Sequence, residues 1–140
     1  MVTAAHLLLL LVDDDPVILD LLDGSLTDAG FEVVIAGRGA HALAEINANG
    51  ARFSAIITDI KLDPLGSDGW EIARRARELA PDIPVVYISG GCAFEWPSKG
   101  VSNSVMIAKP FALAQLMHAV SLLLRDAEAI TAPPRRPRRP

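Results

Sequence analysis

Five short apolar runs, separated by stretches of helical periodicity, constrain the fold of this chain more than any other feature. Three stretches (7–12, 55–57 and 85–88) carry apolar residues without alternation, which is typical of strands buried on both faces of a sheet. An alternation of strands and helices predicts a parallel sheet with helices on both faces, the doubly wound α/β class. The predicted strands are 7–12, 32–36, 53–58, 84–89 and 104–108.

Between the runs, apolar residues recur at helical spacing. Asp15 is predicted to cap the first helix, Pro16 suits its first turn, and Gly30 is predicted to end it. The helices with clear bounds are 16–29, 70–79 and 111–125.

Composition and charge divide the chain into two parts. The 140 residues fit one domain, and an apolar content of 51% supplies a packed core. Four of the 13 basic residues are arginines in the Pro-rich end, which leaves 9 basic against 17 acidic residues elsewhere, a net charge of -8. We therefore predict a folded domain over 1–127 and a disordered tail over 128–140. The acidic domain disfavours nucleic acid as a partner, because phosphate contacts dominate that affinity.

The sequence also favours the cytoplasm as the compartment. Cys92 is the only cysteine, so no internal disulfide can form and a reducing environment is expected. The first apolar run is too short for a signal peptide and lacks a basic leader. No stretch approaches the roughly 20 apolar residues that span a bilayer, so no membrane association is expected.

Polar residues follow directly on four of the apolar runs. In a doubly wound sheet, ligands bind beyond the carboxyl ends of the strands, and Asp13, Asp14, Asp59, Ser89 and Lys109 stand there. Clustered carboxylates suit Mg²⁺, and an aspartate beside that ion can attack a phosphoryl donor. Taken singly, each residue has a plainer interpretation as a helix cap, a turn residue or a solvated loop residue. Their joint placement on four strand ends favours a site.

On these residues the chain resembles the receiver domains of bacterial response regulators, from about residue 6 to residue 125. The motifs are LLLVDDDP (9–16), AIITD (55–59), VVYISG (85–90) and KPF (109–111). The resemblance implies a flavodoxin-like (βα)5 fold, a five-stranded parallel sheet with strand order 2-1-3-4-5.

The resemblance also implies a role for each site residue. Asp59 would be the phosphoacceptor, while Ser89 and Lys109 would bind the phosphoryl oxygens. Asp14 and Asp59 would ligate Mg²⁺ directly and Asp13 through water. The backbone carbonyl of Lys61 would complete the protein ligands, and a cis bond is expected between Lys109 and Pro110.

By this resemblance the protein is a single-domain response regulator that receives phosphate from a histidine kinase or a histidine phosphotransfer protein. It would catalyse only its own phosphorylation and dephosphorylation. It would signal to an unknown downstream protein through protein contacts, and a weak homodimer is compatible with such a module. One alternative is a receiver-like binding module that works without phosphorylation. Another is a Mg²⁺-dependent phosphohydrolase that uses Asp13 and Asp15 as nucleophile and acid.

Three features depart from the family pattern. The loop 61–69 is longer than the usual form, and Met106 stands where the family has an aromatic switch residue. In the segment 90–103, Gly90, Gly91, Pro97 and Gly100 leave room for a turn or two of helix at most. We therefore expect phosphorylation to rearrange the loops 61–69 and 90–103, with little change in the fifth strand.

Overall fold

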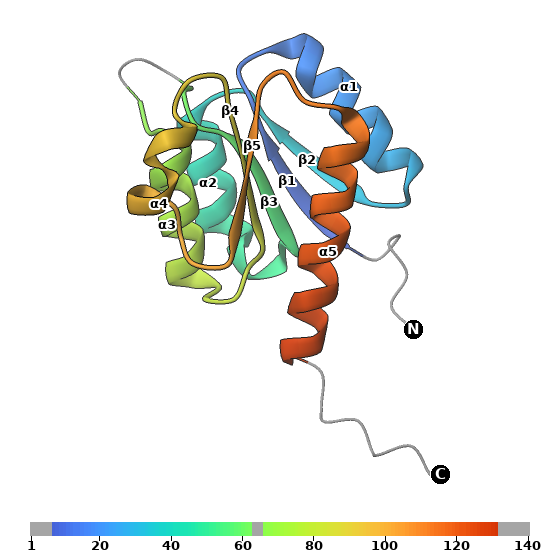
Figure 1. Ribbon diagram of the computed structural model, residues 1–140. Coiled ribbons are helices and arrows are strands. Elements are labelled where there is room, and N and C mark those ends of the chain that lie inside the picture. Colours follow the sequence, from blue (N-terminus) through green and yellow to red (C-terminus); the bar gives the residue numbers. More distant parts are fainter. Residues whose placement is uncertain (1–6, 63–65, 132–140) are drawn as a thin grey trace.

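The computed structural model describes residues 7–62 and 66–131, which form one parallel sheet between two layers of helices (Figure 1). The sheet order is β2-β1-β3-β4-β5, and neighbouring strands pair in parallel. This confirms the predicted doubly wound, flavodoxin-like fold. The strands are β1 (Leu8–Val12), β2 (Glu32–Ala36), β3 (Ala55–Asp59), β4 (Val85–Ser89) and β5 (Ser104–Ala108).

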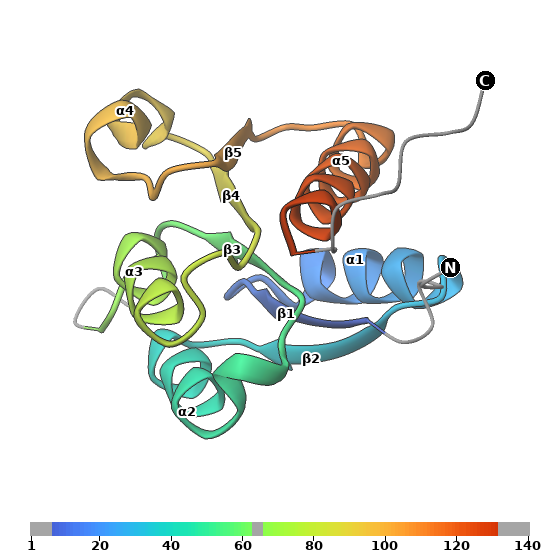
Figure 2. The same cartoon turned by 90° about the horizontal axis from the view of Figure 1, so that it is seen from below.

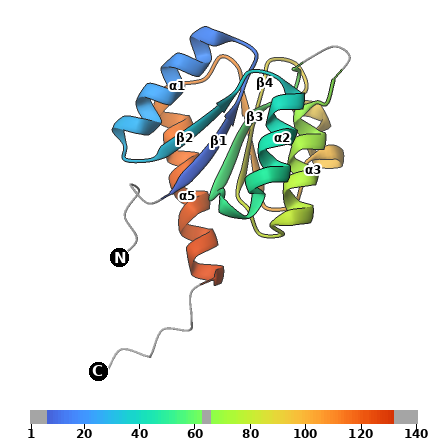
Figure 3. The same cartoon turned by 180° about the vertical axis from the view of Figure 1, so that it is seen from behind.

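The helices divide between the two faces of the sheet, which Figure 2 shows from below. One face is covered by α1 (Pro16–Asp28) and α5 (Leu113–Thr131). The other is covered by α2 (Gly39–Asn49) and α3 (Gly69–Leu79), which lie side by side in Figure 3. The short helical turns η3 (Ala93–Glu95) and α4 (Trp96–Lys99) connect β4 to β5, and η2 (Gly50–Arg52) follows α2.

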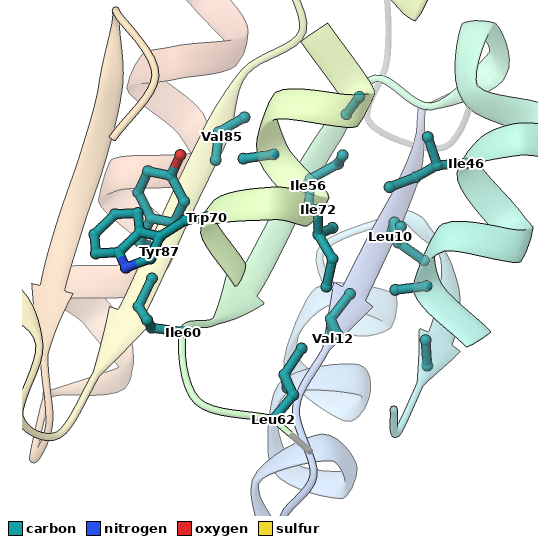
Figure 4. Packing of buried hydrophobic residues seen from close by; sticks show 14 of the residues in the cluster. Leu10, Val12, Ile46, Ile56, Ile60, Leu62, Trp70, Ile72, Val85 and Tyr87 are labelled. Atoms are coloured by element: carbon teal, nitrogen blue, oxygen red, sulfur yellow. The ribbon is translucent and has the colours of Figure 1, made fainter. Parts of the chain in front are cut away.

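Side chains point alternately to the two faces of the sheet, so each central strand contributes residues to two separate cores. In β1, Leu9 and Leu11 face the layer of α1 and α5, whereas Leu10 and Val12 face α2 and α3. All four are completely buried, which explains why the run shows no polar alternation. Figure 4 shows the core beneath α2 and α3.

The predicted start of the first helix is confirmed. The Asp15 side chain accepts a hydrogen bond from the Val17 backbone N–H at 2.9 Å and caps the helix. After the helix, Gly30 has a φ of 99°, the left-handed conformation that glycine adopts without strain.

The predicted bounds of strands and helices lie within two residues of the observed ones, except at the end of the last helix, which was predicted at residue 125. The third strand begins at Ala55 instead of residue 53, because the turn η2 runs to Arg52 and Phe53 ends it. The last helix continues to Thr131, past the domain boundary predicted at residue 127, and its Ala- and Glu-containing end has high helix propensity. The rest of the predicted tail, 132–140, lies outside the described residues.

The segment between β4 and β5 contains only the turns η3 and α4, as its glycines and proline predict. Within 7–62 and 66–131, none of the helices is long and apolar enough to cross a membrane.

Candidate functional site

Three strand ends meet at one edge of the sheet and bring acids and a lysine together. Asp13 directly follows β1, Asp59 is the last residue of β3, and Lys109 directly follows β5. Strands β1 and β3 are neighbours at the point where the strand order reverses, which is where such sheets bind ligands. Asp13 is completely buried and Asp59 is 6% exposed, so their carboxylates are largely withdrawn from water.

Asp13, Asp14 and Asp59 form a group of carboxylates able to hold a metal ion. One oxygen from each lies within 4.8 Å of the others, and Asp14 is the exposed member. Hard oxygen donors in this number suit Mg²⁺, which keeps several of its waters when it binds protein. The residues therefore fit the metal that the sequence predicts.

Lys61, the fourth predicted ligand, lies two residues beyond Asp59 with an exposed side chain. The ligand role of its backbone carbonyl stays a prediction. The adjoining residues 63–65 of the long loop lie outside the described residues.

Lys109 holds the two buried carboxylates by ion pairs. Its Nζ donates to Asp59 Oδ2 at 3.1 Å and to Asp13 Oδ2 at 3.4 Å. The Lys109 backbone N–H donates to the Ser89 carbonyl at 2.7 Å, which fixes the end of β5 against β4. The peptide bond between Lys109 and Pro110 is cis, as predicted.

The electrostatics of the site follow from burial first and pairing second. Burial raises the pKa of Asp59, although the hydrogen bond and charge of Lys109 oppose it. Burial likewise raises the pKa of Asp13, against the hydrogen bond from the Asp15 backbone. For Lys109, burial lowers the pKa, but the hydrogen bonds and charges of Asp59 and Asp13 outweigh it and raise the pKa. Burial therefore destabilises the ionised carboxylates, and a bound cation would offset this destabilisation.

Ser89 is placed at the same edge, but its hydroxyl faces the following loop. Ser89 Oγ accepts hydrogen bonds from the backbone N–H groups of Gly91 at 3.2 Å and Cys92 at 2.6 Å. Both interpretations of Ser89, as a turn residue and as a site residue, are compatible with this position, because a hydroxyl can do either by a small movement.

Asp15 stands outside the acidic group. Its side chain caps α1 and its backbone N–H donates to Asp13 Oδ1 at 2.9 Å. An aspartate engaged in capping is poorly placed as the acid of a phosphohydrolase, which weighs against that alternative.

Two glycines, Gly39 and Gly69, shape the site in ways that the sequence pattern alone does not predict. A Cβ on Gly69 would meet the backbone of Asp59 and Ile60, and a Cβ on Gly39 would meet the carbonyl of Ser67. These close approaches hold the loop after β3 against the sheet and against α2. The adjacent pair Asp68-Gly69 is a recognisable helix start, since Asp68 accepts from the Glu71 N–H at 3.0 Å. Nothing in the sequence marks Gly39.

The sequence matches the family model of the response regulator receiver domain over residues 9–121. The transcriptional regulatory protein PrrA of Mycobacterium bovis is 36% identical over 118 residues, which make up 83% of this chain and 49% of PrrA. The response regulator receiver protein CpdR of Brucella abortus is 31% identical over 118 residues, 83% of this chain and 95% of CpdR. The chain thus spans about half the length of PrrA and nearly all of CpdR.

A solved structure is similar as well. The crystal structure of a response regulator receiver protein from Sinorhizobium medicae WSM419 superposes with a TM-score of 0.83 and is 44% identical, covering 88% of this chain and 98% of that one.

Proposed function

The chain belongs to the response regulator receiver domain family, and on that premise we propose that Asp59 accepts a phosphoryl group in two-component signalling. The observation that carries this proposal is the position of Asp59 at the end of β3. Two further carboxylates stand beside it, and the Lys109 ammonium lies 3.1 Å from Asp59 Oδ2.

The proposed step is a nucleophilic displacement at phosphorus. A carboxylate oxygen of Asp59 attacks the phosphorus of a phosphohistidine on the donor protein. The P–O bond forms, the P–N bond breaks, and the imidazole leaves with the bonding electron pair and takes up a proton. The product is an acyl phosphate on Asp59, and water later attacks it to return aspartate and inorganic phosphate.

Asp13, Asp14, Asp59 and the Lys61 carbonyl would hold Mg²⁺, which neutralises charge on the transferred phosphoryl oxygens when bound. Lys109 is positioned to pair with another of those oxygens. Ser89 would donate its hydroxyl proton to a third after a short movement away from its loop. The domain catalyses only its own phosphorylation and dephosphorylation.

A histidine kinase or a histidine phosphotransfer protein would supply the phosphoryl group, and a downstream protein would read the phosphorylated surface. The match over nearly the whole of CpdR supports a single-domain regulator. The free thiol of Cys92 agrees with a cytoplasmic location, and a weak homodimer stays a prediction.

Incubation with Mg²⁺ and a small acyl phosphate donor tests the proposal. We expect the intact mass to rise by one phosphoryl group, and Asp59→Asn to abolish the gain. Asp20→Asn, an exposed acid on α1, is the matched control and keeps it. Absence of incorporation would favour the phosphorylation-independent binding module, and multiple turnover of an unrelated phosphate ester would favour a phosphohydrolase.

A further inference from the structure

We propose that Thr58 positions the reacting carboxylate by holding the peptide group between Asp59 and Ile60 with its buried hydroxyl. The inference rests on the proposed phosphorylation of Asp59. It assigns a role in that reaction to a side chain outside the acidic group, because adjacent residues of a strand leave opposite faces of the sheet.

Thr58 is a polar residue in a largely apolar core. In the sheet it pairs with Val12 of β1 and Tyr87 of β4, and both neighbours belong to the core beneath α2 and α3, which Figure 4 shows. Thr58 itself is completely buried. Side chains that pair across a sheet leave the same face, so the Thr58 hydroxyl lies in this core, away from water.

A hydroxyl in such surroundings is unfavourable unless it is hydrogen-bonded. Thr58 Oγ1 donates to the backbone carbonyl of Asp59 at 2.8 Å. Valine is branched in the same way as threonine and would fill the same space without a polar atom, so packing alone does not account for the hydroxyl. The bond to the Asp59 carbonyl does.

The carbonyl that Thr58 holds lies at a crowded point of the fold. A Cβ on Gly69 would meet this carbonyl, so α3 begins directly against its oxygen. Held between the Thr58 hydroxyl and the start of α3, the carbonyl has a fixed direction. That direction fixes the backbone angle ψ of Asp59, the residue that carries the reacting carboxylate.

The N–H of the same peptide group is held as well. The Ile60 N–H donates to the Ile88 carbonyl on β4 at 3.1 Å. This amide also lies near the Asp59 carboxylate, since burial raises the pKa of Asp59 and the amide, after Lys109, opposes that rise. One residue further, the Gly69 N–H donates to the Ile60 carbonyl at 2.8 Å and holds the chain as it leaves the strand.

The reaction depends on this backbone through the orientation of the nucleophile. Phosphoryl transfer needs the attacking oxygen in line with the bond that breaks. The Lys109 ammonium holds the Asp59 carboxylate itself, and the Thr58 hydroxyl holds the backbone that bears it. Without the hydroxyl, the peptide group after Asp59 is less firmly fixed, and the carboxylate spends less time in the productive orientation.

Hydrogen exchange of the metal-free protein, followed by NMR, tests the contact itself. We expect Thr58→Val to lower the protection of the Ile60 amide about tenfold more than that of the Ile57 amide, the effect of losing one typical hydrogen bond. The Ile57 amide lies in the same strand and corrects for any change in global stability. Equal changes at the two amides would show that Thr58 does not hold this peptide group.

The rate of phosphorylation tests what the contact does. With a small acyl phosphate donor and saturating Mg²⁺, we expect Thr58→Val to take up the phosphoryl group about tenfold more slowly than the wild type. Thr58→Ser keeps the hydroxyl and should react within about twofold of the wild-type rate, although the loss of a buried methyl group makes it unfold more readily. A purely structural role predicts instead that both folded variants react at the wild-type rate.

Thr27→Val is the matched control. The Thr27 hydroxyl is exposed near the end of α1, where it donates to Asp23 Oδ1 at 3.3 Å. This variant should change neither the rate of phosphorylation nor the exchange of the Ile60 amide.

The intact mass of the wild type after treatment with the donor separates two kinds of failure. If the wild type takes up no phosphoryl group, the proposed function fails, and this inference fails with it. If the wild type and Thr58→Val react at the same rate, or Thr58→Ser is as slow as Thr58→Val, the role of Thr58 is wrong and the proposed function stands.

Discussion

Asp13 and Asp59 are buried carboxylates whose only nearby cation in the described residues is Lys109. Burial raises the pKa of both, so each binds its proton more tightly in the folded protein than in the unfolded chain. Folding stability contributed by these groups is therefore present at low pH and is lost as the pH rises through their raised pKa values. In the absence of a metal, the site lowers the stability of the fold at neutral pH.

It follows that Asp59→Asn should stabilise the metal-free protein. We expect the free energy of unfolding to rise by about 1 kcal/mol at pH 7, because the amide carries no charge to desolvate. The gain should shrink as the pH falls below the raised pKa of Asp59 toward the ordinary value of 3.8, because the folded wild-type carboxyl then takes up a proton and no longer carries a buried charge. Urea denaturation with a chelator at pH 7 and pH 4 measures both values, and a variant less stable than wild type at pH 7 would contradict this account.

Asp14 and Asp13 should contribute unequally to Mg²⁺ binding. Asp13 Oδ1 already accepts from the Asp15 N–H and its Oδ2 pairs with Lys109, whereas Asp14 is exposed. We expect Asp14→Ala to weaken Mg²⁺ binding more than Asp13→Ala does. Titration of both variants with Mg²⁺ checks this, and equal affinities would count against the proposed asymmetry of the ligands.

At the scale of elements, the start of α3 depends on a close approach between backbones. Gly69→Ala should destabilise the fold by about 2 kcal/mol, since the new Cβ meets the backbone of Asp59 and Ile60. Gly24→Ala is the matched control inside α1, where a Cβ meets nothing within 4 Å. There we expect a gain of about 0.5–1 kcal/mol. Chemical denaturation measures the free energy of unfolding of both variants. Equal changes in the two variants would contradict the steric explanation.

The sequence predicted some elements better than others, for physical reasons. The central strands β1, β3 and β4 are buried on both faces, which leaves continuous apolar runs that are easy to identify. The bounds of α2 could not be predicted from the sequence. Arg38 precedes the helix without a side-chain cap, and the helix begins at one glycine and ends before another.

The positions of the candidate site residues in the fold could be predicted from the sequence, whereas the contacts between their side chains could not. Each acid follows an apolar run, so its place at the sheet edge follows from the strand pattern. The pairing of Lys109 with Asp13, 96 positions away, requires the strand order, which the family resemblance supplied. The orientation of the Ser89 hydroxyl had no signal, since a serine before two glycines serves equally as a turn residue and as a ligand.

At the scale of the whole molecule, the Arg/Pro-rich end is expected to contribute little to the stability of the acidic domain. Apart from Ala132, residues 132–140 are prolines and arginines, so the sequence offers no large apolar side chain to dock on the core. We expect deletion of 132–140 to leave the melting temperature nearly unchanged. A fall of several degrees would mean that the arginines bind the acidic domain.

The central claim is that Asp59 is the phosphoacceptor, and direct mapping of the modified residue tests it best. Reduction of an acyl phosphate with borohydride converts the aspartate to homoserine, which peptide mass spectrometry locates. After treatment with Mg²⁺ and an acyl phosphate donor, we predict homoserine at position 59 alone, and none when a chelator removes the metal. Homoserine at Asp13, Asp14 or another residue, or no conversion at all, would contradict the account.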